Sequence, residues 1–468
     1  MSDPFRPQYH FTPAKNWIND PNGLVWFDGE YHLFYQYNPE GDQWGHMSWG
    51  HAVSTDLVHW EELAVAIPED ARHMIYSGSV VVDWQNSSGF GDGVKPPLIA
   101  LYTGAERGDG GIQSQCLAYS HDRGRTWDKY AGNPVLDIGL EHFRDPKVFW
   151  HEGTARWVMV VSRAKENRAS LYCSPDLKNW THLSDIGPGG AGGDLWECPD
   201  LFPLAVENAP GEMRWAFKVD LFTCADRQGS AAMIILGDFD GKTFTPERDD
   251  SGAIRWQWAD WGREFYAAMS WSDIPESDGR RIWIGWMNNH MLASKTPTSP
   301  WRGAMTVPRA LSLRRDRERH LLIQKAVREI GAIRTETGRR GVALTAETNA
   351  FELHIAVETR ATLVISAGPE DSIVIVIDRA KGMMSVDRSC AGLMVDNRDY
   401  AALCAAPIEK IPVSSSLQLL FDACSIELFA DGGATALTSL HFLRGAAFQL
   451  SLSGASDADS MEIYPLAN

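Results

Sequence analysis

Short apolar runs alternate with polar turn signals along the N-terminal part of the chain. Five runs rich in β-branched and aromatic residues each follow a turn signal, at residues 29–35, 97–102, 156–161, 214–219 and 281–286. Corresponding positions in successive runs are 67, 59, 58 and 67 residues apart. A period of about 60 residues built from short strands is typical of four-stranded blades placed around one axis. Because long helical periodicity is absent, the pattern predicts a five-bladed β-propeller.

A different pattern begins after residue 335. Apolar and polar residues alternate at residues 350–355, 362–365, 373–377 and 425–429, with turns between the runs. This alternation favours an antiparallel β-sandwich. The sequence therefore predicts an all-β protein, in which a five-bladed β-propeller is followed by a C-terminal antiparallel β-sandwich.

The tryptophans mark the boundary between the two patterns, since all 19 lie at or before Trp301. We expect the propeller at residues 1–322, a charged linker with a helical turn at 323–335, and the sandwich at 336–468. The sandwich has few clusters of ionisable residues, so we expect it to support the propeller and not to perform chemistry.

The composition of the 468 residues limits the partners of the protein. Hydrophobic residues make up 44% and charged residues 22% of the chain, as in soluble globular proteins. No apolar run reaches the ~18 residues that a membrane span requires. The net charge of −18 disfavours binding to nucleic acid or to anionic membranes. The sequence leaves the oligomeric state open.

The seven cysteines form neither a metal-binding nor a disulfide pattern. They cannot all pair, and none belongs to a Cys-x-x-Cys motif, so we expect buried free thiols and no metal site. The first residues lack the apolar core of a signal peptide. The sequence as given predicts a cytoplasmic protein, while secretion or a periplasmic location after removal of a leader stays open.

Three carboxylates lie in short segments that proline interrupts and aromatic residues flank. Asp20 lies in Asn-Trp-Ile-Asn-Asp-Pro-Asn-Gly at residues 16–23, Asp145 in Arg-Asp-Pro, and Glu197 in Glu-Cys-Pro. The first stretch is rich in turn-forming residues, so we expect a rigid turn that fixes the carboxylate. Taken alone, it would be interpreted as a hairpin turn with a capping aspartate. The two later segments favour a chemical role instead.

A propeller would bring these carboxylates together, because the inner strands of its blades surround one axis. Asp20 precedes the first apolar run, Asp145 the third and Glu197 the fourth. Crowded carboxylates raise one another's pKa, so that one stays protonated while another is ionised. Glycoside hydrolysis requires this division between an acid and a nucleophile or base. Nearby tryptophans, including Trp17 and Trp286, offer flat apolar faces for sugar rings.

Several motifs resemble those of glycoside hydrolase family 32, the family of invertases, inulinases and levanases. The N-terminal signature is matched at residues 17–23. Further matches follow in the family's order, at residues 34–39, 49–52, 77–79, 144–146, 197–199, 285–287 and 300–305, and residues 425–433 resemble the sandwich signature. The resemblance covers nearly the whole chain.

The resemblance implies a role for each matching position. Asp20 matches the nucleophile, Glu197 the general acid/base, and Asp145 the transition-state stabiliser that hydrogen-bonds the fructosyl hydroxyls. The implied substrate-binding residues are Trp17, Asn19, Gln36, Trp44, Tyr76, Ser77, Arg144 and Trp286. The family implies a retaining β-fructosidase that releases terminal β-D-fructofuranosyl units from fructans (inulin, levan) and sucrose, with no metal or organic cofactor.

Three positions depart from the usual family pattern. Tyr76 stands where many members have phenylalanine, which adds a hydroxyl to the pocket wall. Glu264 replaces the usual aspartate and is one methylene longer. Ser48 stands where the phosphosucrose-cleaving branch usually has histidine, which favours the exo-inulinase and levanase type.

Alternative interpretations remain open at this point. The chain also fits an invertase-like enzyme or a transfructosylating enzyme of the same family. In a transfructosylating enzyme, a sugar hydroxyl replaces water as the acceptor. A non-catalytic carbohydrate-binding propeller would be expected to lack a carboxylate, and all three are present. We interpret the Ser-x-Asp…Trp segment at residues 120–127, which resembles the Asp box of sialidases, as a structural turn. We interpret His51 as a hydrogen-bonding residue of the core.

Overall fold

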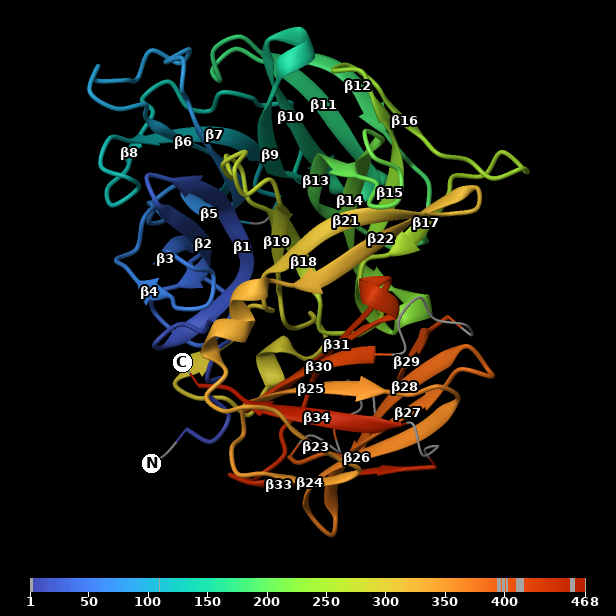
Figure 1. The fold of residues 1–468 in the computed structure, drawn as a ribbon. Helices are drawn as coiled ribbons and strands as arrows, with labels where there is room; N and C mark the ends of the chain where they lie inside the picture. Colours follow the sequence, from blue (N-terminus) through green and yellow to red (C-terminus); the bar gives the residue numbers. More distant parts are fainter. Residues whose placement is uncertain are drawn as a thin grey trace.

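The computed structural model describes residues 3–108, 110–393, 397, 400, 403–409, 416–454 and 459–467. These residues form two β-domains that lie side by side, a propeller of five sheets and a sandwich of two sheets (Figure 1). The predicted fold class is therefore confirmed. In the described part of the chain, helix is limited to short 3₁₀ turns, namely η1 (Glu152–Thr154), η2 (Ala164–Glu166), η3 (Ala225–Arg227), η4 (Ala293–Lys295), η5 (Arg328–Ile333) and η6 (Asp431–Gly433).

The five apolar runs of the sequence each form the second strand of one blade, as the repeat pattern requires. The first blade contains β1 (Asn16–Phe27), β2 (Glu30–Asn38), β3 (Ser48–Ser54) and β4 (Glu61–Glu62). The second contains β5 (His73–Val82), β6 (Leu98–Glu106), β7 (Gln113–Ser120) and β8 (Asp128–Lys129). The third contains β9 (Phe143–His151), β10 (Arg156–Arg163), β11 (Arg168–Ser174) and β12 (Thr181–Ile186).

The last two blades complete the circle. The fourth contains β13 (Trp196–Ala205), β14 (Met213–Cys224), β15 (Gly229–Phe239), β16 (Phe244–Pro246) and β17 (Trp256–Trp258). The fifth contains β18 (Tyr266–Ser270), β19 (Arg281–Trp286), β21 (Arg309–Asp316) and β22 (Arg319–Ala326). The short strand β20 (Trp301–Arg302) then returns to pair in parallel with the start of β1. A late segment of the chain thus joins the first blade and closes the ring.

Neighbouring blades are held together by apolar side chains from both. Val25 and Phe34 of the first blade pack with Val80 and Ala100 of the second, and all four are fully buried. Equivalent clusters fill the other spaces between blades. Because burial of such side chains is the main favourable term in folding, these clusters set the inner strands firmly around the axis.

The Ser-x-Asp…Trp segments are structural turns at blade edges, as the sequence suggested. Asp122 Oδ1 accepts from the backbone N–H of Thr126 at 2.9 Å, and its Oδ2 accepts from the Thr126 hydroxyl at 2.6 Å. Asp176 accepts from two backbone N–H groups in the corresponding turn of the third blade. These carboxylates are therefore engaged in stabilising the turns.

The sandwich consists of two antiparallel sheets of six strands each. Phe351, Leu353 and Ile355 alternate along one strand and are fully buried against the facing sheet, which confirms the predicted alternation. One sheet has the order β23 (Arg339–Gly341), β34 (Ser460–Pro465), β25 (Phe351–Ala356), β30 (Ser416–Asp422), β31 (Ser425–Ala430) and β32 (Thr435–Leu440). The other has the order β24 (Ala343–Ala346), β33 (Phe448–Ser453), β26 (Arg360–Gly368), β27 (Asp371–Asp378), β28 (Met383–Cys390) and β29 (Leu403–Pro407).

The segment between the two domains is more ordered than a linker. Strand β22 runs to Ala326, so residue 322 lies inside a strand of the fifth blade. Helix η5 follows, with Ile330 and Ile333 buried. A division between η5 and β23 leaves every strand whole.

A buried ionic network joins the propeller to the sandwich. Arg309 of the propeller donates to Asp260 at 2.8 Å and also to Glu427 of the sandwich. His10, which precedes the first blade, lies 2.8 Å from both Asp422 and Glu427. All five side chains are buried, so the two domains share one polar core.

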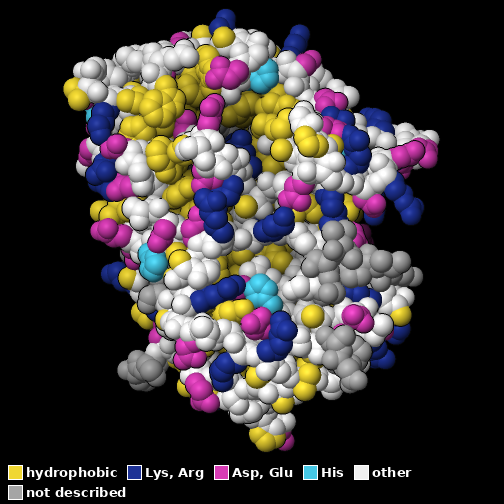
Figure 2. All heavy atoms as spheres, viewed as in Figure 1, with side chains coloured by type: hydrophobic (Ala, Val, Ile, Leu, Met, Phe, Trp, Pro, Cys, Tyr) yellow, Lys and Arg dark blue, Asp and Glu magenta, His cyan; other side chains and the backbone are white. Residues whose placement is uncertain are grey.

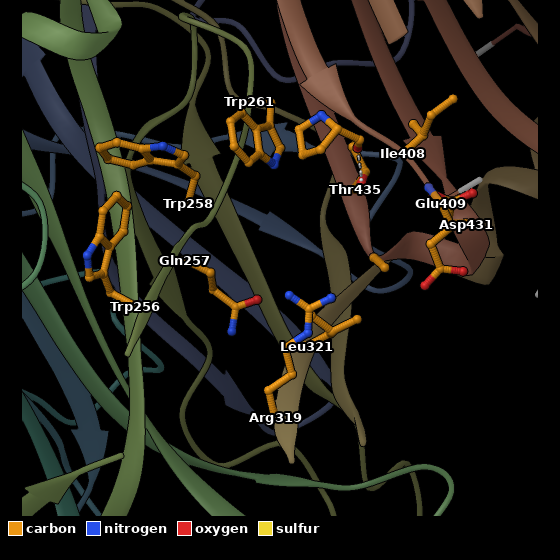
Figure 3. A pocket seen from close by; sticks show the side chains of 12 residues that line it. Trp256, Gln257, Trp258, Trp261, Arg319, Leu321, Ile408, Glu409, Asp431 and Thr435 are labelled. Carbon is orange, nitrogen blue, oxygen red and sulfur yellow. Dashed lines mark hydrogen bonds between the residues drawn. The ribbon is translucent and has the colours of Figure 1, made fainter. Parts of the chain in front are cut away.

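A hollow of about 440 Å³ lies at the outer edge of this junction (Figure 3). Trp256, Trp258 and Trp261 line one side of it, and side chains of the sandwich line the other. Among the described residues, no helix has the length and apolar character needed to cross a membrane.

Candidate active site

Each of the five inner strands is irregular at the same level of the propeller. The pairing register shifts next to Asp20 in β1, next to Tyr76 in β5, next to Glu197 in β13 and next to Tyr266 in β18. In β9 the shift lies next to Asp145, whose φ is +67°. Bulges of this kind re-aim side chains and are common beside active sites. Here they turn one side chain of each blade toward the axis.

The stretch around Asp20 is therefore not the predicted turn. It lies within the continuous strand β1, which carries two register shifts, one on each side of Pro21 and Asn22. The turn-forming residues serve the irregular backbone instead. Gly23 adopts φ +55°, and a Cβ there would lie 2.6 Å from Phe34. The sequence signal for an unusual backbone was correct, but the backbone is a bulged strand.

Asp20 is fixed by neighbours from three segments. Ser77 donates its hydroxyl to Asp20 Oδ2 at 2.6 Å, and the Asn19 amide donates to Oδ1 at 3.1 Å. The Trp17 indole in turn donates to Asn19 at 2.7 Å. The Cys198 thiol lies 3.4 Å from Oδ2. The carboxylate is thus oriented while remaining only partly buried.

Glu197 is held by one cation and one phenol. Arg144 donates to Glu197 Oε1 from two nitrogens, at 3.0 and 2.8 Å. The Tyr266 hydroxyl donates to Oε2 at 2.6 Å, and the His290 ring nitrogen lies 3.9 Å from the same oxygen. Although burial raises the pKa of Glu197, Arg144, His290 and Tyr266 outweigh it and lower the pKa below its usual value.

Burial and crowding favour the protonated form of the Asp145 carboxyl by raising its pKa. Burial raises its pKa, Arg144 opposes this, and the charges of Glu197 and Asp20 raise it further, to about 7. Its Oδ2 accepts from the backbone N–H of Cys198 at 2.9 Å. The expectation that crowding keeps one carboxyl protonated thus applies here to Asp145, whereas Glu197 is ionised.

A second buried carboxyl lies behind Glu197. Asp220 is the cross-strand partner of Glu197 and accepts a hydrogen bond from Lys218, and both side chains are fully buried. Burial raises the pKa of Asp220 to about 8, with Lys218 opposing and Asp20 and Glu197 adding to the shift. Lys218 also donates to the carbonyl of Cys198 at 3.1 Å, so this pair supports the irregular backbone after Glu197.

The structure places the other predicted residues around these carboxylates to different degrees. Trp17, Asn19, Ser77 and Arg144 are linked to Asp20 or Glu197 by the bonds above. Trp286 is fully buried, with its ring centroid 6.0 Å from that of Trp17.

Trp44, Tyr76 and Gln36, the remaining predicted residues, form no hydrogen bond with the three carboxylates among the described residues. Trp44 is 52% exposed and meets the half-buried Tyr76 edge-on, with ring centroids 6.1 Å apart. Gln36 is buried, and its amide nitrogen has no hydrogen-bond partner among the described residues. The indole nitrogen of Trp286 is unpartnered in the same sense. These two donors are available to a ligand.

Sequence reasoning missed several residues that touch this group. Tyr266 and His290 contact Glu197, and their rings lie 4.8 Å apart. Gln113 and His142 both bond Arg144, at 3.0 and 2.9 Å. Tyr266 follows by two residues Glu264, one of the family positions named in the sequence analysis, so that segment could have indicated it. His290, Gln113 and His142 lie in no segment with a signal of its own.

Comparisons with known proteins identify the family of the chain. A profile described as "Glycosyl hydrolases family 32 N-terminal domain" matches residues 10–326, and one described as "Glycosyl hydrolases family 32 C terminal" matches residues 313–465. The chain is a member of glycoside hydrolase family 32. The family resemblance read from the sequence is therefore confirmed, and the protein is a glycoside hydrolase.

Two relatives and a solved structure show how far the similarity extends. A levanase of Bacillus subtilis (strain 168) is 41% identical over 99% of this chain and 70% of its own length. The extracellular exo-inulinase inuE of Aspergillus niger is 36% identical over 99% of this chain and 95% of its own length. The crystal structure of an exo-inulinase from Aspergillus awamori superposes with a TM-score of 0.91 at 34% identity, covering 99% of each chain.

The three departures from the family pattern have distinct structural settings. Glu264 reaches Arg388 of the sandwich, at 2.9 and 3.0 Å, so its extra methylene serves the domain junction. The Ser48 hydroxyl accepts from the backbone N–H of Glu69 at 3.0 Å and is buried. Tyr76 lies beside the carboxylates, whose charges together with burial raise its pKa.

Proposed function

We propose that this family 32 enzyme releases terminal fructosyl units from fructans and from sucrose by a retaining mechanism. The convergence of Asp20, Asp145 and Glu197 from three blades carries the proposal. The levanase and exo-inulinase relatives support fructans as the substrate class.

In this mechanism Asp20 attacks the anomeric carbon while Glu197 donates a proton to the leaving oxygen. Asp20 suits attack because Ser77 and Asn19 orient its two oxygens. The covalent fructosyl-enzyme is then hydrolysed by water that Glu197 deprotonates. Tyr266 and Arg144 keep the Glu197 carboxyl in one orientation for both steps.

Substrate binding must favour protonation of Glu197. Glu197 is ionised beside Arg144, so it must gain a proton before it acts as an acid. A sugar hydroxyl that accepts from Arg144 would weaken the Arg144–Glu197 pair and favour protonation of Glu197. Formation of the ester removes the charge of Asp20, which lowers the pKa of Asp145. Asp145 then ionises more readily and stabilises positive charge at the anomeric carbon.

Product analysis tests the proposal. The enzyme is incubated separately with sucrose, inulin and levan, and products are separated by chromatography from the first minutes. We expect fructose to dominate from the start on the polymers. A ladder of oligosaccharides with little monomer would contradict release from the chain end, and sugars longer than the donor would indicate transfructosylation.

Replacement of Asp20 tests its role. Asp20→Asn is nearly isosteric, so the fold should persist while kcat falls by several powers of ten. Asp176→Asn, in a blade-edge turn, serves as the matched control and should leave kcat unchanged. If Asp20→Asn kept more than about a hundredth of the wild-type kcat, Asp20 would not be the nucleophile.

A further inference from the structure

A hollow of about 710 Å³ opens on the propeller, and its floor reaches Lys147 and Asp200, which follow Asp145 and Glu197 by two and three residues. Its lining comes from the distal parts of the same inner strands, for example His151 in β9 and Pro203 in β13. In β9, His151 lies six positions beyond Asp145, which is about 20 Å of strand. The hollow therefore occupies the opposite mouth of the central axis. Figure 2 shows this face, with hydrophobic side chains bordering a depression in the propeller.

Aromatic side chains form much of its wall. Trp84, Trp150, Trp157 and Trp215 all line the hollow. Trp84 is 59% exposed, although its indole nitrogen is fixed to Asp273 at 2.8 Å. A large side chain that is anchored at one end yet exposed over its ring is unusual on a soluble protein. It offers a rigid flat surface to a ligand.

Balanced charges form the floor. Lys147 lies 3.8 Å from Asp200, and both are buried. Arg281 and Asp273 add one cation and one anion to the same lining. Two cations thus face two carboxylates in the floor, while the exposed Glu152 and Glu276 add two carboxylates to the lining, so the hollow as a whole is acidic. This lining disfavours an anion, and its carboxylates can accept hydrogen bonds from the hydroxyls of a neutral molecule.

Two buried polar atoms of the lining lack hydrogen-bond partners among the described residues. They are the indole nitrogen of Trp150 and the hydroxyl of Ser270. The backbone of Ser270 is held on both sides, because its N–H donates to Asp200 at 2.8 Å and its carbonyl accepts from Lys147. Buried polar groups are rarely left unpaired, so these two are the unsatisfied polar atoms of the lining.

We propose that this second mouth is a binding site for a neutral oligosaccharide. Trp84 stacks on a sugar ring, and the Trp150 N–H and the Ser270 hydroxyl bond sugar hydroxyls. Volumes of this size and linings of aromatic residues with a few fixed polar groups are typical of small-molecule sites. That the sugar is a fructan rests on the proposed function. A polymer held at this mouth would keep the enzyme on its substrate through multivalent binding.

The hollow at the domain junction offers a comparison, since it is also lined by tryptophans (Figure 3). Its polar side chains are already engaged: Gln257 bonds the backbone of Leu322 at 3.0 Å, and Thr435 bonds that of Pro407 at 2.8 Å. Trp256 is 39% exposed there. It provides a matched control for Trp84.

Retardation in native gels that contain levan or inulin tests the proposal. All variants carry Asp20→Asn, so that the polymer is not consumed and the active site contributes equally to every lane. We expect Trp84→Ala to weaken retardation at least about tenfold, the loss typical of a principal contact residue. Trp256→Ala should leave it unchanged. With Asp20 intact, Trp84→Ala should hydrolyse sucrose at the wild-type rate.

Equal retardation with and without Trp84 would overturn the proposal, as would an equal loss in the Trp256→Ala control. Trp150→Phe retains an aromatic ring but removes the N–H, and it provides a second test if Trp84→Ala folds poorly; we expect weaker retardation with sucrose hydrolysis preserved. Failure of the wild-type enzyme to cleave sucrose or fructans would instead refute the proposed function, because the gel measures binding without turnover.

Discussion

His10 provides a quantitative test of the polar core between the two domains. Its ring nitrogens lie 2.8 Å from Asp422 and 2.8 Å from Glu427, and all three side chains are fully buried. Burial by itself lowers the pKa of His10, but hydrogen bonds and charge from the two carboxylates raise it from 6.5 to about 9. The structure therefore contains a buried imidazolium between two carboxylates. The substitution His10→Gln removes the charge and keeps a polar side chain.

The size of the effect follows from the linkage between protonation and folding. The folded protein binds this proton more tightly than the unfolded chain, so the contribution to stability is fully present below pH 6.5. It is lost as the pH rises through about 9. Each pKa unit corresponds to about 1.4 kcal/mol, which gives about 3 kcal/mol for the whole shift. Between pH 6 and pH 10, the stability advantage of the wild type over His10→Gln should therefore fall by about 3 kcal/mol.

Urea unfolding at a series of pH values measures this advantage. Other groups also titrate in this range, but they are common to both proteins and cancel in the difference. His59, paired with Asp56 but 54% exposed, provides the control His59→Gln. Because exposed pairs contribute little, its stability should follow the wild type at every pH. A difference between wild type and His10→Gln that stays constant from pH 6 to pH 10 would refute the buried imidazolium.

Three further predictions concern the active site and the junction. Asp145→Asn should abolish turnover and stabilise the fold by up to about 4 kcal/mol at pH 8. In the wild type, ionisation of the buried Asp145 carboxyl destabilises the folded state, because its pKa is raised from 3.8 to about 7. This destabilisation is absent below pH 3.8 and complete above pH 7, and asparagine removes it. Urea unfolding at pH 5 and 8 checks it, and equal stability at pH 8 would contradict it. Tyr266→Phe removes a hydrogen bond to the Glu197 carboxylate, so the pKa of Glu197 should rise. The alkaline limb of the pH profile of kcat/KM should then move to higher pH. An unchanged alkaline limb would show that Tyr266 does not lower the pKa of the catalytic acid. Glu264→Asp should lower stability by about 3 kcal/mol because Arg388 loses its buried partner, while sucrose turnover per folded molecule stays the same.

Much of the fold was predictable because strand periodicity is a local property of the sequence. The five apolar runs proved to be the second strands of five blades, and the alternation in the C-terminal part proved to be a sandwich. The end of the propeller was harder to place. Strand β22 continues to Ala326 because its pairing with β21 extends to Arg309, and no turn signal marks residue 322. Pairing partners that decide such a boundary lie elsewhere in the chain.

The candidate site was predictable in its carboxylates but not in its protonation. Asp20, Asp145 and Glu197 lie in motifs, and so does Arg144, whereas Tyr266 and His290, which lower the pKa of Glu197, come from the fifth blade and the segment after it. Arg144 contacts Glu197 across 53 residues of sequence, and Tyr266 contacts it across 69. His290 lies in a segment without a distinctive pattern. Which carboxyl keeps the proton depends on these long-range contacts, so sequence alone could not assign it to Asp145.

The repeated bulges explain how five similar blades form a site in which each blade contributes a different side chain. Regular inner strands would present alternate residues to the axis at fixed heights. A bulge adds a residue and rotates the next side chain, so each blade offers a different group at one level. The left-handed backbone at Asp145, Cys198 and Ala267 costs of order 1 kcal/mol at each residue. The buried apolar clusters between blades offset this cost. The site is therefore rigid because all five blades pack against one another.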